Sequence, residues 1–544
     1  MVASQSGLWR YDRILHACIL ASEALNRQTM VTHGMKMIPT RSRARPILLI
    51  LASLLTLAGS LPRAQVGKAR RDEFLAMFAR SYYPGRSAQV MIVPREYEIL
   101  TRKDESYLFM HGSPWDYDIR IPYILYGPPF VHAGSYPEVA THQDMAPTLA
   151  ATMHLALPST ITGHVLQQAI DPTAEAPRVI FLAVLDAMRA DYLDDYAASL
   201  PTLSRLRREG AWFPNARVNY LPSATAVAHS TISTGSDPRV HGIVVNTQYD
   251  RVRNRPADVF PEKDVSTLMV PTIADEANVS TNGRSIIYAQ AGLYYAAAGL
   301  AGHGGCFWNG RPVMAVSYDQ DRGTWATNPE CFRMPEYLAS LNSRPLWESA
   351  GGTWRGHNIA NPTEIRRSAL FPKFEAEALV SVIEHEPIGA DQVTDLLLAN
   401  LKSLDFVGHK YGPGSVEIAD TLAEMDRQLG RIVDALDRKV GRGGYVIAIT
   451  ADHGMPPEPS GGRGGRHTEP EMLALLHQKF DPAGKLFRVY EAANSQIFVD
   501  TDRMRELGVT LKQIAQYLED QPFIYAAYSE DEVQARAAAT PTDP

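Results

Sequence analysis

Two stretches decide the predicted fold: RVIFLAVLDAMRADYL at residues 178–193 and LPSATAVAHSTISTGSDPRVHGIVVN at residues 221–246. In the first, residues 178–185 form a nearly continuous apolar run, the pattern of a strand buried on both faces of a parallel sheet. Asp186 follows at once, at the carboxyl end of that strand, where open α/β sheets place their chemistry. The second stretch supplies Thr225, whose hydroxyl could act as a nucleophile once a base or a metal activates it.

Two further buried strands are predicted downstream, TDLLLANL at residues 394–401 and YVIAIT at residues 445–450. Between them, apolar residues recur at spacings of three and four over residues 418–436, which predicts an amphipathic helix. Strands that alternate with helices indicate an α/β fold with a mostly parallel central sheet and helices on both faces. Residues 251–388 are rich in Gly, Pro, Trp and Tyr with weak periodicity, and we predict an inserted cap region there.

A carboxylate follows each of the three predicted strands. In chain order these residues are Asp186, Asp405 and Asp452. His409 lies four residues beyond Asp405, and His453 is adjacent to Asp452. A single aspartate after a strand is more often a helix N-cap than a metal ligand. Because the carboxyl ends of parallel strands meet at one edge of a sheet, the combined set nevertheless predicts a metal site. Asp and His ligands without Cys favour zinc.

The composition is that of a large globular protein, with 544 residues, 45% hydrophobic and 21% charged, and a net charge of -7. This balance lacks the basic footprint of a nucleic-acid-binding protein. A small phosphorylated substrate is still compatible with it, because such a molecule needs only local positive charge. The sequence does not predict an oligomeric state.

An apolar run at residues 47–58, ILLILASLLTLA, follows several basic residues and precedes small residues that suit signal-peptide cleavage. The run is short for a membrane span. We therefore predict an upstream extension at residues 1–34, a signal peptide at residues 35–64 and a periplasmic or secreted location, with an uncleaved anchor as the alternative. Cys306 and Cys331 would be the cysteines left after cleavage, and they could pair in an oxidising compartment.

Five motifs together carry a resemblance to a known family: LDAMRADYL, TAVAHSTISTG, HGI, LDFVGHKYGP and ADHG. They resemble the alkaline phosphatase superfamily, and within it the type I phosphodiesterase/nucleotide pyrophosphatase branch and the related threonine-nucleophile bacterial alkaline phosphatases. The resemblance covers most of residues 74–533 and implies two zinc ions. The implied ligands are Asp186, Asp452, His453 and the nucleophile Thr225 for one ion, and Asp405 and His409 for the other.

In this family the second ion takes one more histidine, from a motif near the carboxyl terminus. The segment that resembles this motif, MHGSPWDYDIRIPYILYGPPF, lies here at residues 110–130, near the amino terminus. We therefore predict a single circularly permuted domain over residues 68–544, with His111 as the missing ligand. The alternative is that His111 belongs to a separate amino-terminal domain. Permutation is physically tolerable where the two termini lie close together on the surface.

The resemblance also implies a mechanism, in which a phosphoester is cleaved through a phospho-threonine intermediate on Thr225. Asn246 matches the family's asparagine that donates to a phosphate oxygen, and its competing interpretation is a turn residue. The hydroxyls that compete with Thr225 on composition alone are Ser223, Ser230, Thr231 and Thr234. Only Thr225 has the family's position, four residues before His229. We predict that His229 and His241 are structural.

Two positions bear on the choice between monoester and diester substrates. The monoesterase branch has a Lys-x-Arg pair that holds the extra phosphate charge, and the matching positions here are Leu293 and Tyr295. A terminal phosphate carries about -1.5 to -2 charge at neutral pH, whereas a diester carries about one negative charge. Diester or pyrophosphate substrates are therefore favoured, and Tyr294 or Tyr295 could face the organic group or simply pack in the cap. The alternatives are an alkaline phosphomonoesterase and a non-catalytic metal-binding protein.

Overall fold

The structure is a computed structural model and describes residues 63–544 except 261–262, 307–312, 461, 492–494 and 540–544. The chain divides into two compact units, Met1–Lys68 and Ala69–Pro544, and the second contains both large sheets. The first described helix is α3 (Arg63–Ser81). The predicted upstream extension and all but the last two residues of the predicted signal peptide therefore lie outside the described residues. None of the described helices is long and apolar enough to cross a lipid bilayer.

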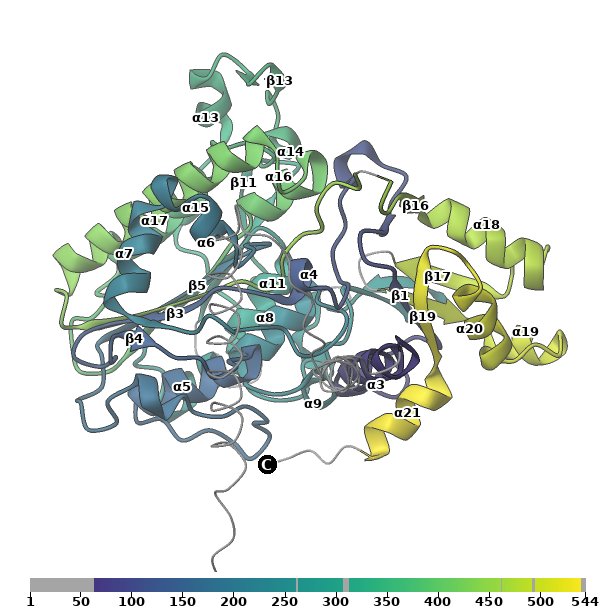
Figure 1. Cartoon of the computed structure of the whole chain (residues 1–544). Coiled ribbons are helices and arrows are strands. Elements are labelled where there is room, and N and C mark those ends of the chain that lie inside the picture. Colours follow the sequence, from purple (N-terminus) through teal and green to yellow (C-terminus); the bar gives the residue numbers. More distant parts are fainter. Residues whose placement is uncertain (1–62, 261–262, 307–312, 461, 492–494, 540–544) are drawn as a thin grey trace, which may run out of the picture. The chain divides into compact units, whose positions relative to one another are not determined.

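The larger sheet has nine strands and forms the centre of the second unit (Figure 1). Its order is β11 (Thr324–Ala326), β10 (Met314–Asp319), β9 (Ile287–Ala291), β14 (Asp395–Leu401), β5 (Val179–Leu185), β15 (Tyr445–Thr450), β3 (Tyr123–Tyr126), β6 (Ala211–Trp212) and β4 (Gly134–Ser135). The five strands from β10 to β15 in this order run parallel, whereas β11, β3 and β6 each pair antiparallel with a neighbour. The predicted α/β class with a mostly parallel sheet is confirmed.

The three strands predicted from apolar runs lie next to one another in the middle of this sheet. Every residue of β5, β14 and β15 is buried. In the register of the sheet, Leu185 pairs with Leu401, and Val184 pairs with Thr450. The three strands therefore end at the same edge, and the residues that follow them start from neighbouring positions.

Helices cover both faces of the nine-stranded sheet (Figure 1). On one side lie α7 (Pro201–Glu209), α15 (Phe371–His385) and α17 (Val416–Lys439), and on the other lie α5 (Met145–Thr152) and α8 (Thr225–Thr234). The predicted apolar stripe of residues 418–436 is buried along α17, which packs against α15 and α7. The stripe consists of Ile418, Leu422, Met425, Leu429, Ile432 and Leu436.

The second sheet joins the two ends of the chain. Its order is β17 (Phe487–Glu491), β18 (Gln496–Val499), β1 (Val90–Pro94) and β19 (Ile524–Ser529). The early strand β1 pairs antiparallel with both late strands β18 and β19. Val90 and Ile92 of β1 share a hydrophobic core with Ile514 of α20 (Leu511–Glu519) and with residues of α18 (Glu469–Phe480).

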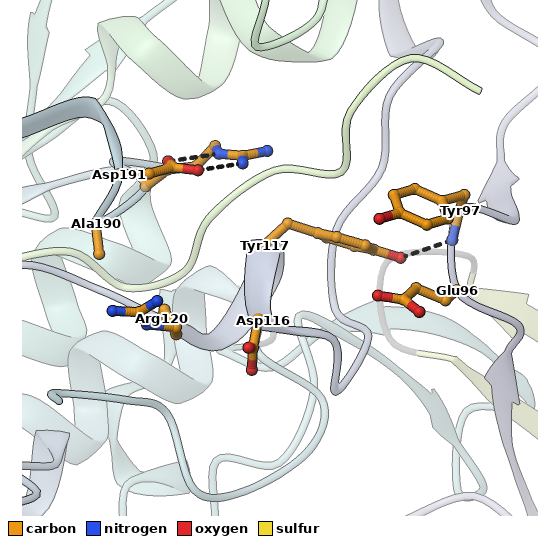
Figure 2. A pocket seen from close by; sticks show the side chains of 8 residues that line it. Glu96, Tyr97, Asp116, Tyr117, Arg120, Ala190 and Asp191 are labelled. Carbon is orange, nitrogen blue, oxygen red and sulfur yellow. Dashed lines mark hydrogen bonds and ion pairs between the residues drawn. The ribbon is translucent and has the colours of Figure 1, made fainter. Parts of the chain in front are cut away.

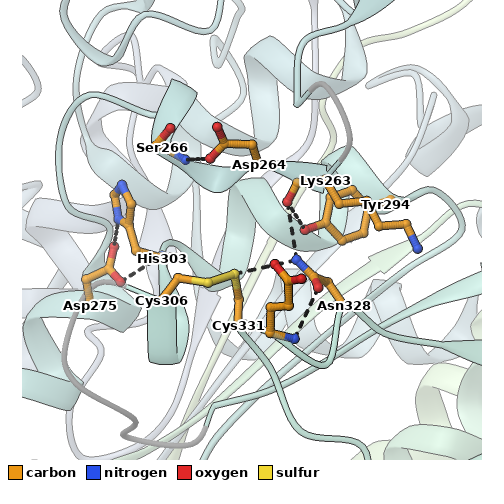
Figure 3. The surroundings of a disulfide bond; sticks show 10 residues. Lys263, Asp264, Ser266, Asp275, Tyr294, His303, Cys306, Asn328 and Cys331 are labelled. Carbon is orange, nitrogen blue, oxygen red and sulfur yellow. Dashed lines mark hydrogen bonds and ion pairs between the residues drawn. A yellow bond between two sulfur atoms is a disulfide. The ribbon is translucent and has the colours of Figure 1, made fainter.

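The region predicted as a cap, residues 251–388, contributes directly to the central sheet. It supplies β9, β10 and β11, together with α10 (Ile273–Ser280), α11 (Tyr294–Ala301) and α15. It also carries the small hairpin β12 (Thr353–Trp354) and β13 (His357–Asn358). Cys306 and Cys331 form a disulfide within this region, across a sequence separation of 25 residues (Figure 3). The pairing that the sequence allowed is therefore present.

Candidate active site

The candidate site lies at the edge where β5, β14 and β15 end. The amide of Asp186 donates to the carbonyl of Leu401 at 3.0 Å, which holds the first residues beyond β5 and β14 side by side. Asp452, two residues beyond β15, accepts a hydrogen bond from the amide of Ala187 at 3.1 Å. Thr225 is the first residue of α8 and its side chain is buried. The amino terminus of a helix favours negative charge, so this position suits a hydroxyl that becomes an alkoxide.

Asp405 and His409 come from the helix that follows β14, α16 (Ser403–Tyr411). The Nε2 atom of His409 is 3.2 Å from the Oδ1 atom of Asp405. Residues four apart lie on the same face of a helix, so both side chains point in the same direction. The sequence placed Asp405 at the end of the strand, whereas the structure places it one helical turn further on.

His111 lies in the same site, although it comes from the amino-terminal part of the chain. Its Nε2 atom is 3.7 Å from Oδ1 of Asp405, and its ring stacks on the ring of His453 with the centroids 3.4 Å apart. The structure therefore brings His111 together with Asp405, His409 and His453. His111 also belongs to the same compact unit as Asp405 and His453, Ala69–Pro544.

Four histidines at the site are oriented in the same way. In each of them the Nδ1 atom donates to a backbone carbonyl, so the Nε2 atom keeps its lone pair, which is the usual arrangement of metal-binding histidines. The pairs are His111 with Ser223 at 3.0 Å, His229 with Thr225 at 2.7 Å, His409 with Phe109 at 2.5 Å and His453 with Gly454 at 2.9 Å. Burial lowers the pKa of His229 to about 4 and that of His453 to about 3, and it holds the pKa of His111 well below the usual value. The imidazoles of His111, His229 and His453 are therefore neutral at neutral pH.

Two groups of side chains have ligand atoms close enough to hold a metal ion. The first is His111, Asp405 and His453, and the second is Asp186, His229 and Asp452. His453 also borders the second group, because its Nε2 atom is 3.3 Å from Oδ2 of Asp452 and 3.6 Å from Oδ1 of Asp186. The sequence assigned His453 to Asp186 and Asp452, and it treated His229 as structural.

The donor atoms in these groups fit divalent metal ions. Among the residues that the structure describes, four buried atoms of the two groups have no hydrogen-bond partner. They are Oδ1 of Asp405, Nε2 of His453, Oδ2 of Asp452 and Nε2 of His229. Buried polar atoms are almost always hydrogen-bonded, so unpartnered donor atoms that converge are the expected lining of a cation site. Carboxylate oxygen and imidazole nitrogen without thiolate match the ligand preference of zinc.

The carboxylates of the two groups differ in their electrostatics. Burial alone would raise the pKa of Asp405, but the neighbouring His409 and Lys402 outweigh burial and hold that pKa well below its usual value. Burial raises the pKa of Asp186, although Lys402 opposes this shift. Burial and the nearby Asp186 together raise the pKa of Asp452 well above its usual value.

Lys402 is the main side chain at the candidate site that the sequence did not predict. It is 2% exposed, and its Nζ atom lies 2.7 Å from Oδ2 of Asp405, 2.9 Å from Oδ1 of Asp186 and 3.1 Å from Oγ1 of Thr225. Burial alone would lower the pKa of Lys402, but the two carboxylates hold it well above the usual value, so the side chain is charged. The signal was present in the sequence, because Lys402 directly follows β14 just as Asp186 directly follows β5.

A cavity of about 80 Å³ opens onto these groups. Of the predicted site residues, it is lined by His111, Thr225, Asn246, Asp405 and His409. Its wall also contains the uncharged Leu293 and Tyr295 and, besides Lys402, the cations Arg102 and Arg366. Asp186, Asp452 and His453 are fully buried behind this lining.

Two side chains predicted at the cavity have defined orientations. The Oδ1 atom of Asn246 accepts a hydrogen bond from the amide of Ala226 at 2.9 Å, which fixes the side-chain amide. Tyr295 lines the cavity, whereas the hydroxyl of Tyr294 donates to the carbonyl of Lys263 at 2.9 Å (Figure 3). Of the two tyrosines, Tyr295 is therefore the one that could contact a substrate.

A larger cavity of about 200 Å³ lies elsewhere, among Tyr97, Tyr117, Arg189 and Asp191 (Figure 2). The Nε atom of Arg189 donates to Asp191 at 2.9 Å, and the amide of Tyr97 donates to the hydroxyl oxygen of Tyr117 at 3.1 Å. None of the predicted site residues lines this cavity. The smaller cavity beside the two ligand groups is therefore the candidate active site.

Comparison with known proteins identifies the family. Residues 180–540 match the type I phosphodiesterase / nucleotide pyrophosphatase family. Alkaline phosphatase PhoV of Synechococcus elongatus is 28% identical, over 63% of this chain and 72% of its own. Alkaline phosphatase PafA of Elizabethkingia meningoseptica is 27% identical, over 66% of this chain and 76% of its own. The crystal structure of wild-type PafA covers 64% of this chain and 77% of its own, with a TM-score of 0.52 and 24% identity.

The family match spans well over half of the chain, and the likeness to the PafA structure shows the predicted alkaline phosphatase-like fold. The chain therefore belongs to the type I phosphodiesterase / nucleotide pyrophosphatase family, which are phosphoester hydrolases of the alkaline phosphatase superfamily.

Proposed function

We propose that this protein is a zinc-dependent phosphoester hydrolase that acts on a small phosphorylated molecule through a phospho-threonine intermediate on Thr225. The observation that carries the proposal is the position of the Thr225 hydroxyl, at the first turn of α8 and in the wall of the cavity beside both ligand groups. When bound at these groups, divalent ions supply charge neutralisation for the phosphoryl group and lower the pKa of a nearby hydroxyl.

The residues of the chain have defined roles in this proposal. One ion would be held by His111, Asp405, His409 and His453. The other would be held by Asp186 and Asp452, with His229 and also His453 close enough to contribute. The Thr225 hydroxyl loses its proton to solvent, its Oγ1 atom forms a bond to phosphorus, and the bond to the leaving-group oxygen breaks, with that oxygen taking up a proton from solvent. Water then displaces Oγ1 from phosphorus and regenerates the hydroxyl. Asn246 would orient a phosphate oxygen through its fixed amide.

Diester or pyrophosphate substrates are the first choice for this site. Leu293 and Tyr295, which stand where the monoesterase branch has its cationic pair, line the cavity and carry no charge at neutral pH. An alkaline phosphomonoesterase is the second candidate, because Lys402 and Arg366 line the same cavity and could hold the additional phosphate charge. PhoV and PafA, which are named alkaline phosphatases, agree with this second candidate.

Hydrolysis rates on matched p-nitrophenyl monoesters and diesters, with zinc added, distinguish the two candidates. We expect the larger kcat/KM for a diester, because the uncharged wall at Leu293 and Tyr295 accommodates an organic group. A strong preference for the monoester would instead assign the charge-holding role to Lys402 and Arg366.

The substitution Thr225→Ala tests the nucleophile. We expect turnover to fall about a thousandfold or more, with bound zinc retained, because only the attacking oxygen is lost. Thr231→Ala is the matched control, since Thr231 lies on the same helix and donates to the carbonyl of Val227. Persistent hydrolysis by Thr225→Ala would show that Thr225 is not the nucleophile. If the wild-type protein hydrolysed no phosphoester, a metal-binding protein without catalysis would be favoured.

We also propose that residues 68–544 form one circularly permuted domain and that the protein is periplasmic or secreted. The permutation is supported by the family match that begins at residue 180, by the pairing of β1 with β18 and β19, and by His111 at the site. The location is supported by the predicted signal peptide and by the disulfide between Cys306 and Cys331, because disulfides persist in oxidising compartments. Amino-terminal sequencing of the exported protein would test the predicted cleavage.

A further inference from the structure

A buried ammonium lies at the centre of the candidate site. The Nζ group of Lys402 has three protons, and three oxygen atoms surround it: Oδ1 of Asp186, Oδ2 of Asp405 and Oγ1 of Thr225. The ammonium donates hydrogen bonds to Asp186 and Thr225 and forms an ion pair with Asp405, so the charge is held in a fixed position. Because an ammonium can only donate, the Thr225 oxygen accepts this hydrogen bond and keeps its own proton available for release.

Several elements of the fold hold this lysine in place. The backbone amide of Lys402 donates to the Glu375 carboxylate of α15 at 2.6 Å, and Ser403 donates to the same carboxylate. The stem of the lysine passes over Gly292, where an added Cβ would stand 2.6 Å from the Cβ and 2.8 Å from the Cγ of Lys402. Only a glycine leaves room there. The position of the Lys402 side chain is therefore fixed by the surrounding fold.

The ammonium touches one carboxylate of each ligand group as well as the nucleophile. Asp405 belongs to the first group and Asp186 to the second, so Lys402 lies between the positions that divalent ions would take. It also lines the cavity in which the phosphoryl group would bind. A fixed cation at this point stabilises negative charge on the Thr225 oxygen and on the phosphoryl oxygens without any reorganisation during the reaction.

We propose that Lys402 is a catalytic residue of this site, a cation carried by the protein that donates to the Thr225 oxygen and shares Asp186 and Asp405 with the divalent ions. This inference rests on the proposed function. In the first step the Thr225 hydroxyl loses its proton to solvent, the bond from Oγ1 to phosphorus forms and the bond to the leaving-group oxygen breaks, and that oxygen takes up a proton from solvent. In the second step a water oxygen bonds to phosphorus and loses a proton to solvent, while Oγ1 departs and takes up a proton. Lys402 keeps its protons throughout and donates to Oγ1 whenever that oxygen carries negative charge.

The position of Lys402 predicts what should happen when an uncharged residue replaces it. A positive charge that shares two carboxylates with divalent ions must weaken the binding of those ions by repulsion. The same charge accelerates the reaction. Removing it should therefore move zinc affinity and turnover in opposite directions, whereas damage to a residue with only a structural role would lower both.

The test compares Lys402→Met and Lys402→Gln with the wild-type protein. We expect zinc, titrated by calorimetry and counted by elemental analysis, to bind at least about tenfold more tightly to both variants. We expect kcat to fall about a hundredfold on the best p-nitrophenyl ester, with a smaller change in KM, as for the loss of one charge donor. Lys410→Met is the matched control, since Lys410 lies on α16, the helix that Lys402 caps, and its ammonium pairs with Glu364 at 3.0 Å. We expect the control to resemble the wild type in both measurements.

Three outcomes would overturn the proposal. They are weaker zinc binding together with lower kcat, unchanged zinc binding, and unchanged kcat. Lys402→Gln keeps a hydrogen-bond donor and a polar end, so it serves as the folded variant if methionine beside the two carboxylates prevents folding. Failure of the proposed function would be visible in the wild-type protein, as absent phosphoester turnover, whereas failure of the Lys402 proposal would be visible only in the variants.

Discussion

The two ligand groups lie in one buried site and use the same kinds of side chain, yet their charges are balanced differently. In the first group, Asp405 is surrounded by imidazoles and an ammonium, and its pKa is held low. In the second group, Asp186 and Asp452 face each other in a buried space, and both pKa values are raised. Ionising both carboxylates of the second group is therefore costly in the metal-free protein, and a bound cation would offset that cost. Two sites built from the same types of ligand can therefore differ in how strongly a bound cation stabilises them.

His111→Ala should have the largest effect in this comparison. We expect zinc affinity at the first group to fall at least about a hundredfold, because a ligand is lost and Asp405 keeps its remaining partners. Zinc titration of the purified variant measures this directly. His164→Ala is the control, since His164 is exposed and belongs to neither group. Unchanged zinc binding by His111→Ala would remove the first group as a metal site and weaken the permutation proposal.

Asp452→Asn should separate metal binding from stability in the second group. We expect zinc affinity to fall about tenfold or more because a ligand charge is lost. The metal-free variant should be more stable than the metal-free wild type at pH 8, by roughly 1–3 kcal/mol, because asparagine avoids the cost of keeping or ionising a buried carboxyl whose pKa is raised.

The sign of the pH dependence follows from the raised pKa of Asp452. In the metal-free wild type, the unfolded carboxyl ionises first as the pH rises above about 4, so stability falls from there towards the raised folded pKa. Chemical denaturation with a chelator present, between pH 4 and 8, would measure this slope. Asp434→Asn, at an exposed position of α17, is the control. A steeper slope in Asp452→Asn than in the wild type would contradict the comparison.

Gly292→Ala should disturb the lysine that links the two groups without changing any charge. The added methyl group must push the stem of Lys402, so we expect kcat to fall about tenfold while the zinc content stays the same. Steady-state kinetics and elemental analysis provide the two measurements. Gly443→Ala is the control, because nothing lies within 4 Å of a Cβ added there. Wild-type kcat in Gly292→Ala would mean that the exact position of Lys402 is unimportant.

Asp118→Asn should have the smallest effect on the chemistry. Asp118 accepts hydrogen bonds from the amide and the hydroxyl of Ser113, at 2.9 and 2.6 Å, and so supports the loop that carries His111. Burial raises the pKa of Asp118 to about 7. Its contribution to stability is therefore fully present below about pH 4 and is lost as the pH rises towards 7.

The variant should not show this loss, because asparagine does not ionise. Thermal unfolding across pH 4 to 8 would reveal the difference, with the exposed Asp116→Asn as control. Parallel pH profiles for Asp118→Asn and the wild type would show that folding does not raise the pKa of Asp118.

The sequence predicted those features that depend on local pattern. The apolar runs of β5, β14 and β15 identified the centre of the sheet, and the stripe of α17 identified its main covering helix. The edge that collects Asp186 and Asp452 followed from the parallel arrangement. His111 followed from the resemblance of its segment to a late family motif, because no local pattern connects it to Asp405.

The features that the sequence did not reveal depend on pairing between distant segments. Lys402 becomes a neighbour of Asp186 only through the register that pairs Leu401 with Leu185. His229 joins the second group because α8 begins beside Asp452, and helical periodicity could not show that. In the same way, β9 to β11 belong to the central sheet because β9 pairs with β14, although weak periodicity suggested a cap.

The sheet that holds β1 between β18 and β19 bears on how the protein is made. The ribosome delivers β1 and His111 first, and their partners follow only after several hundred residues, on the order of tens of seconds later. During that interval the early segment has an unpaired strand edge and an isolated imidazole. A nascent chain therefore cannot assemble the first ligand group before translation has passed Asp405 and His453, which delays metal capture until the polypeptide is nearly complete.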